Sequence, residues 1–142
     1  FGGAMIVRMD ARRRIAAMGQ ASSGPAATER TPRETLVAAH ERIAVLRDAG
    51  GGAADARRRQ AIIHELDAAR TAFFEPFVEM RPVIVAAVGM SGYARVMDAF
   101  AAAERAFNRA WSAAADGYPQ EAEESLAVGL ERLHEAIERA PG

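Results

Sequence analysis

Three histidines are the residues whose chemistry stands out first, because each is followed by a glutamate. The pairs are His40-Glu41, His64-Glu65 and His134-Glu135. A carboxylate-bridged metal site in a helical protein needs inward Glu and Glu-x-x-His groups from several helices. At about 100° per residue, His64 lies opposite the apolar side of its segment, and His40 and His134 lie at the edges of theirs. The one Glu-x-x-His, which begins at Glu131, points outward, so we expect solvated histidines and no metal site.

Two charged residues, Glu104 and Arg70, fall within otherwise apolar helical arcs. Glu104 lies among the aromatic residues of its segment, and Arg70 among the leucine and phenylalanines of another. An inward charge is costly unless it is paired. We therefore treat these two residues as a candidate buried pair, which would also suit a small-ligand or cofactor pocket. The alternative is that both lie at the margin of the core and extend their charged ends into solvent.

Two arginine runs, Arg12–Arg14 and Arg57–Arg59, are candidate anion contacts. Nucleic-acid modules usually combine a basic face with a recognition motif or stacking aromatics, whereas here acidic residues balance the arginines and the net charge is −1. Nucleic-acid binding is therefore the weaker alternative. The run Arg57, Arg58 and Arg59 near a helix start opposes the helix dipole, which makes it a candidate patch for an acidic partner.

The sequence lacks cysteine and the short motifs that most often mark a catalytic site. The chain has no cysteine, which excludes thiol nucleophiles and thiolate metal sites, and all eighteen of its basic Lys and Arg residues are arginine. It contains no Gly-x-Ser-x-Gly elbow, no phosphate loop with Gly-Lys-Ser/Thr and no dinucleotide fingerprint. We expect a protein that is not an enzyme and that needs no cofactor.

The first two helices that must position these side chains have clear start signals. Thr31-Pro32-Arg33-Glu34 is a capping-box pattern, and the glycines at 50–52 predict the end of that helix. A second helix should begin near Asp55. Its wide apolar arc extends to Met80 and favours contact with two neighbours, and Pro76 predicts a kink or break inside it.

Two further helices are expected in the C-terminal part of the chain. One runs from Ser91 to about Asp116 with a near-heptad apolar rhythm, and the other begins at Pro119 and ends before Pro141. The short turn between them predicts an antiparallel hairpin. Residues 82–90 are ambiguous, because a short β-branched run suits a buried strand. No partner strand is available, so we favour a buried helical turn or short helix.

The N-terminal thirty residues are expected to lie outside the bundle. Phe1–Ala4 resemble an expression scar before Met5, residues 5–18 could form a short helix, and residues 19–28 have the Ser, Gly, Pro and Ala content of a flexible linker. The start lacks the layout of a signal peptide, and the longest apolar run is far shorter than the ~20 residues of a membrane span. We expect a cytoplasmic protein without a membrane span.

These observations predict an all-α protein, a mainly antiparallel four-helix bundle over residues 31–142 with a flexible N-terminal arm. Its expected function is non-catalytic: a helical module that binds another protein or itself, as a homo-oligomer. A set of large apolar residues could exceed the needs of one small core and form the partner surface. That set is Phe73, Phe74, Phe77, Met80, Tyr93 and Met97.

Overall fold

The computed structural model describes residues 29–50 and 55–142, so the predicted short helix at 5–18, the linker at 19–28 and the run Arg12–Arg14 lie outside the described residues. The chain divides into two units, Phe1–Arg30 and Thr31–Gly142. Within the second unit, helix α2 (Pro32–Asp48) begins as its capping pattern predicts. The Thr31 hydroxyl accepts a hydrogen bond from the Glu34 amide at 3.1 Å, and the Glu34 carboxylate accepts one from the Thr31 amide at 2.8 Å. These two bonds satisfy amides that an uncapped helix would leave open.

The second helical rod consists of three consecutive segments. Helix α3 (Ala56–Ala69) is capped by Asp55, whose carboxylate accepts from the Arg57 amide at 2.9 Å. It continues into a π-helical turn, η1 (Arg70–Phe74), and a short helix, α4 (Glu75–Glu79). The Glu75 amide donates to the carbonyl of Arg70, five residues back. This wider turn lies immediately before Pro76, which has no amide to donate, so the predicted irregularity takes the form of a π-turn.

The third rod, α5 (Arg81–Asp116), begins ten residues earlier than expected. Residues 82–90 are helical, as favoured, and Ser91 lies within α5 rather than at its start. The helix is kinked at Gly89, whose φ of 76° and ψ of 174° are not helical. Gly117, at φ 86°, then ends α5 in the left-handed conformation that glycine adopts without steric cost, and α6 (Pro119–Arg139) follows directly.

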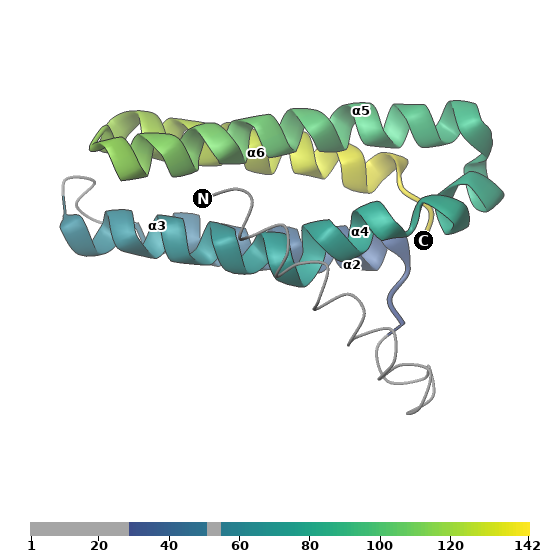
Figure 1. The fold of residues 1–142 in the computed structure, drawn as a ribbon, viewed down its shortest axis with the longest axis horizontal. Helices are drawn as coiled ribbons and strands as arrows, with labels where there is room; N and C mark the ends of the chain where they lie inside the picture. The colour runs from purple at the N-terminus through teal and green to yellow at the C-terminus, as the bar shows by residue number, and fades with distance from the viewer. Residues whose placement is uncertain (1–28, 51–54) are drawn as a thin grey trace, which may run out of the picture. The chain divides into compact units, whose positions relative to one another are not determined.

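The rods of the Thr31–Gly142 unit form a bundle in which consecutive helices are neighbours (Figure 1). Helix α2 packs against α3 and α6, and α5 packs against α3 and α6. The short turn at Gly117 makes α5 and α6 antiparallel partners, and these two helices have the most extensive contact. The predicted all-α helical bundle is therefore confirmed, and the residues that the structure describes include no strand.

The core is built from one large cluster that draws on every rod. Its aromatic centre contains Phe74, which lies edge-on to Phe100 at 5.6 Å and stacks on Phe107 at 5.7 Å between ring centroids. Phe77 contacts the same Phe100 ring at 4.7 Å. Such ring geometries stabilise a core beyond the area they bury. Phe74 of η1, Phe77 of α4 and the aromatic residues of α5 are thus needed inside the bundle.

Candidate interaction surface

The six residues predicted to form a partner surface lie in or against the core. Phe74 and Phe77 are buried, and Phe73, Met80, Tyr93 and Met97 are half-buried against the core cluster. The phenylalanines of η1, α4 and α5 meet in one cluster, which side-chain periodicity within one helix could not reveal. The prediction of a partner surface is therefore wrong for Phe74 and Phe77, and the other four side chains are only partly exposed.

A different apolar surface is exposed where α4 passes into α5. Of the seven large hydrophobic residues that are exposed in the described part of the chain, four fall within a stretch of thirteen residues. They are Val78, Val83, Val88 and Met90, and we call them the elbow surface. Val83 is 56% and Met90 is 57% exposed. The expectation that residues 82–90 are buried is therefore wrong for all but Ile84 and the half-buried Val85.

Two glycines, Gly89 and Gly92, determine the local backbone of the elbow surface in different ways. Gly89 adopts a backbone conformation with positive φ and extended ψ, which is essentially restricted to glycine. Gly92 leaves space for its neighbour one turn earlier, because a Cβ there would lie 2.6 Å from the Cβ of Val88.

The part of the elbow surface that follows Arg81 lacks charged side chains. Residues 82–94 contain no Asp, Glu, Lys or Arg. At one border, the Arg81 guanidinium lies over the Tyr93 ring, 5.2 Å from its centroid, an arrangement that favours a cation over the ring face. At the other border, the Arg95 carbonyl accepts a hydrogen bond from Arg139 Nη1 at 3.0 Å, which ties this end of α5 to α6.

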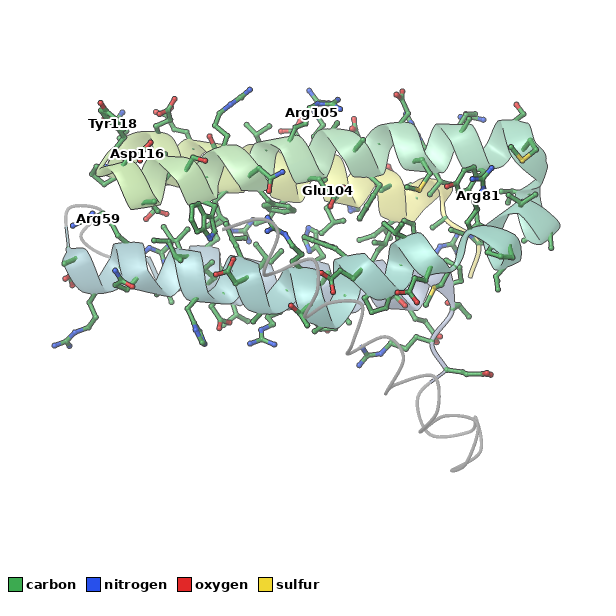
Figure 2. The ribbon with its side chains drawn as sticks, viewed as in Figure 1. Arg59, Arg81, Glu104, Arg105, Asp116 and Tyr118 are labelled. Atoms are coloured by element: carbon green, nitrogen blue, oxygen red, sulfur yellow. The ribbon has the colours of Figure 1, made fainter. Side chains whose placement is uncertain are left out.

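Glu104 and Arg70, the candidate buried pair, lie beside one cavity but are not joined by an ion pair among the described side chains. Nη2 of Arg70 donates instead to Asn108 Oδ1 at 2.6 Å. Burial raises the pKa of Glu104, and the charge of Arg70 acts in the opposite direction. Glu104 extends from α5 toward α3, whereas the next residue, Arg105, extends away (Figure 2).

The cavity beside Glu104 is too small for a metabolite or cofactor. Its volume is about 10 Å³, which is the space of a single water molecule, whereas small-molecule sites usually measure hundreds of Å³. Its lining residues are Leu66, Arg70, Phe74, Glu104, Phe107 and Asn108. A larger hollow of about 530 Å³ lies at the α5–α6 turn around Tyr118 and Glu121. It is open to solvent on one side of a turn and encloses no group of catalytic side chains.

The three arginines predicted as an acidic-partner patch have different environments. Arg58 is 7% exposed, and its guanidinium binds Glu123 of α6 through two hydrogen bonds of 2.7 and 2.8 Å. It also donates to the Leu46 carbonyl at 2.6 Å, so it joins three helices. Arg59 is half-buried, with a 3.4 Å hydrogen bond to the Ala114 carbonyl. Only Arg57 is exposed, so the patch as predicted is not available as a unit.

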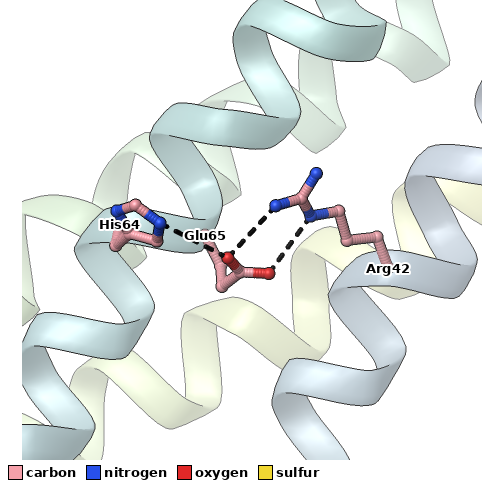
Figure 3. A network of polar contacts seen from close by, with 3 residues as sticks. All are labelled: Arg42, His64 and Glu65. Atoms are coloured by element: carbon pink, nitrogen blue, oxygen red, sulfur yellow. Dashed lines mark hydrogen bonds and ion pairs between the residues drawn. The ribbon is translucent and has the colours of Figure 1, made fainter.

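The three histidines also differ in their surroundings. His64 is 80% exposed, and its Nε2 lies 3.9 Å from the Glu65 carboxylate, which itself accepts two hydrogen bonds from Arg42 across the α2–α3 contact (Figure 3). His40 of α2 and His134 of α6 lie close together, with ring centroids 6.3 Å apart and ring planes inclined at 60°. The helical wheel placed both at the edges of apolar arcs, but it could not show that the two edges meet.

Two general features bear on metal and membrane binding. Residues 29–50 and 55–142 contain no group of three or more His, Asp or Glu side chains placed to hold a metal ion.

By length and composition alone, α5 could cross a membrane, which the length of the apolar run in the sequence did not predict. Core helices of non-membrane proteins meet the same criterion when they are mostly buried, whereas α5 buries Val96, Phe100 and Phe107 but only 22% of its most apolar window.

Comparisons with family models, with curated proteins and with solved structures find no match for this chain.

Proposed function

We propose that this protein is a non-catalytic helical module that associates with a second copy of itself through the elbow surface. The observation that carries the proposal is that four exposed apolar side chains, Val78, Val83, Val88 and Met90, fall within thirteen residues, and that the last three of them lie on the uncharged stretch 82–94. Exposed apolar residues that occur singly need no explanation, whereas a cluster marks an interaction site.

The chemistry of the elbow surface favours another copy as its occupant. In a two-fold dimer the same patch meets itself, so any charge in its centre would face a like charge. The part of the elbow surface that follows Arg81 avoids this repulsion because residues 82–94 carry no charge. Ala86 and Ala87 are exposed between the larger side chains, and their small size allows the two backbones to approach closely.

A membrane surface is the less suitable occupant. Helices that lie on membranes usually combine their apolar face with a Lys- and Arg-rich polar face that is attracted to anionic lipid. Here the net charge of the chain is −1, and the neighbouring Arg81 already lies over Tyr93. The ligand-binding alternative has less support because the cavity beside Glu104 accommodates only a water molecule. The nucleic-acid alternative has less support because Arg58, one of the three arginines in its run, is buried.

The proposal is tested by the mass of the full chain in solution. Sedimentation equilibrium of the unmodified protein is expected to give twice the chain mass at concentrations of tens of micromolar. The double substitution Val83→Glu and Met90→Glu places like charges in the centre of the interface and is expected to give a monomer with an unchanged helical circular-dichroism spectrum. Val45→Glu is the matched control, because Val45 is a 69% exposed valine elsewhere, on α2, and its change should leave the dimer intact.

Two outcomes would overturn the proposal. The first is a monomer at all concentrations of the unmodified protein, and the second is a dimer that survives the double substitution in folded protein. Flotation with vesicles of phosphatidylcholine and phosphatidylserine forms a parallel arm. A monomer that binds these vesicles through Val83 and Met90 would assign the elbow surface to a membrane and exclude the second copy.

A further inference from the structure

His40 and His134 form a pair across the contact between the first and last helices of the bundle. Their ring centroids are 6.3 Å apart and their ring planes are inclined at 60°. His40 is half-buried on α2, and His134 is exposed on α6. The chain has three histidines in all, so two of them meet at one place although they lie far apart in the sequence.

The separation of the two rings matches the reach of one metal ion. A ring nitrogen binds Zn²⁺ at about 2.0–2.1 Å and lies roughly 1.15 Å from the ring centroid, so an ion in line between two imidazoles spans about 6.4 Å. A bent arrangement requires a shorter separation. The observed distance is therefore at the outer limit of the reach, and His134 is the exposed member of the pair.

The His40 side chain is oriented by its surroundings. A hydrogen bond to the backbone of Leu130 fixes the ring. Metal-binding histidines usually donate one ring N–H to such an outer partner, which directs the other nitrogen toward the metal.

The charged groups around the pair have a mixed effect on a cation. Glu41 lies next to His40 in sequence, and a Glu138 oxygen lies 3.9 Å from His134 Nε2 on the same helix. Both carboxylates attract a cation, whereas Arg47 repels it. The described residues place no third ligand at the pair, so water would complete the coordination.

We infer that His40 and His134 form a two-imidazole site for a divalent transition-metal ion, Zn²⁺ or Cu²⁺, that joins α2 to α6. Neutral imidazoles without thiolates suit these two ions, and Cu²⁺ should bind the more tightly of the two. The bound ion connects the first and last helices of the bundle, so binding should stabilise the folded state. The inference is independent of the elbow surface, which involves neither histidine.

The test uses the full chain, freed of any histidine tag, in thermal unfolding with and without excess ZnSO₄ or CuSO₄. We expect the unfolding midpoint to rise by about 5 °C or more at a hundredfold excess over the dissociation constant. Calorimetric titration should give one ion per chain. The variant His134→Gln removes an exposed ligand and should lose the shift and the stoichiometric binding without loss of fold.

A matched control is available in the same chain. His64→Gln removes the lone histidine beside Glu65 and Arg42 and should keep both the shift and the stoichiometry. His40→Gln should behave as His134→Gln; if it does not fold, His134→Gln decides alone. Absence of a metal-dependent shift in the unmodified protein, or a shift that persists in His134→Gln, would overturn the inference.

Discussion

Glu104 is a carboxyl group that the bundle shields from water without giving it a direct counter-ion. Burial raises its pKa more than the charge of Arg70 lowers it, and the Arg70 guanidinium is hydrogen-bonded to Asn108. A carboxyl group whose pKa is raised on folding stabilises the fold below its ordinary pKa, and this contribution is lost as the pH rises through the folded pKa. At neutral pH, ionised Glu104 therefore opposes folding.

The substitution Glu104→Gln should consequently stabilise the protein at pH 7, by up to about 1 kcal/mol. At pH 4 the carboxyl group is itself neutral, so the gain should disappear. Chemical denaturation at both pH values measures this difference, with Glu131→Gln on the exposed side of α6 as the control that should change nothing. A loss of stability at pH 7 would instead mean that Glu104 is ionised and paired with Arg70, as the sequence alone suggested.

The contrast at Glu104 illustrates what single residues reveal before the fold is known. The helical wheel placed Glu104 inward correctly, because that depends only on the position of a residue within its own helix. It could not show that Arg70 turns to Asn108, or that His40 meets His134. Both facts depend on the register between helices, which side-chain periodicity does not encode.

At the scale of elements, the α5–α6 hairpin depends on close approach through small residues. Gly129 of α6 is buried against the Phe107 ring of α5, and a Cβ at that position would lie 2.9 Å from Phe107 Cζ and closer still to Cε1. Buried alanines continue the contact along both helices, including Ala110 and Ala122. The helices pack closely because these positions carry almost no side chain.

Gly129→Ala should therefore destabilise the protein by about 1–3 kcal/mol through overpacking. The sign is informative, because alanine is intrinsically favoured over glycine in a helix by about 1 kcal/mol. Urea denaturation of the single variants and of Gly129→Ala combined with Phe107→Leu completes a double-mutant cycle. The smaller leucine side chain should recover part of the loss, and strictly additive effects would show that the methyl group does not meet this ring.

The elements also show which parts of the fold the sequence could predict. The helix starts at Thr31 and Asp55 and the hairpin turn at Gly117 were predictable because capping and turn formation depend on a few adjacent residues. The exposure of residues 82–90 was not predictable in this way. An apolar, β-branched run has the same local pattern whether the bundle covers it or leaves it at one end.

At the scale of the whole bundle, the two ends of α5 are built differently (Figure 2). At one end, Asp116 and Tyr118 border the tight turn into α6. At the other end, Arg81 begins α5, and the helix is interrupted at Gly89 within the elbow surface. The interruption separates the exposed start of α5 from its buried continuation, so the proposed interface depends on a backbone conformation outside the core.

Gly89→Ala should change assembly more than a comparable change at the opposite end. Gly89 has φ 76° and ψ 174°, a conformation that costs a non-glycine residue about 1–3 kcal/mol. In the alanine variant we therefore expect this segment to relax toward regular helix. The relaxation should displace Val83 and Val88 from their present positions. Sedimentation should then show a weakened dimer in a protein that keeps its helical content.

Gly117→Ala is the matched control. The conformation at Gly117, φ 86° and ψ 29°, also penalises alanine, by about 1–2 kcal/mol, but this turn is far from the elbow. A dimer equally strong in both variants would show that the elbow geometry does not determine association, since both substitutions strain the backbone and only one of them alters the elbow surface.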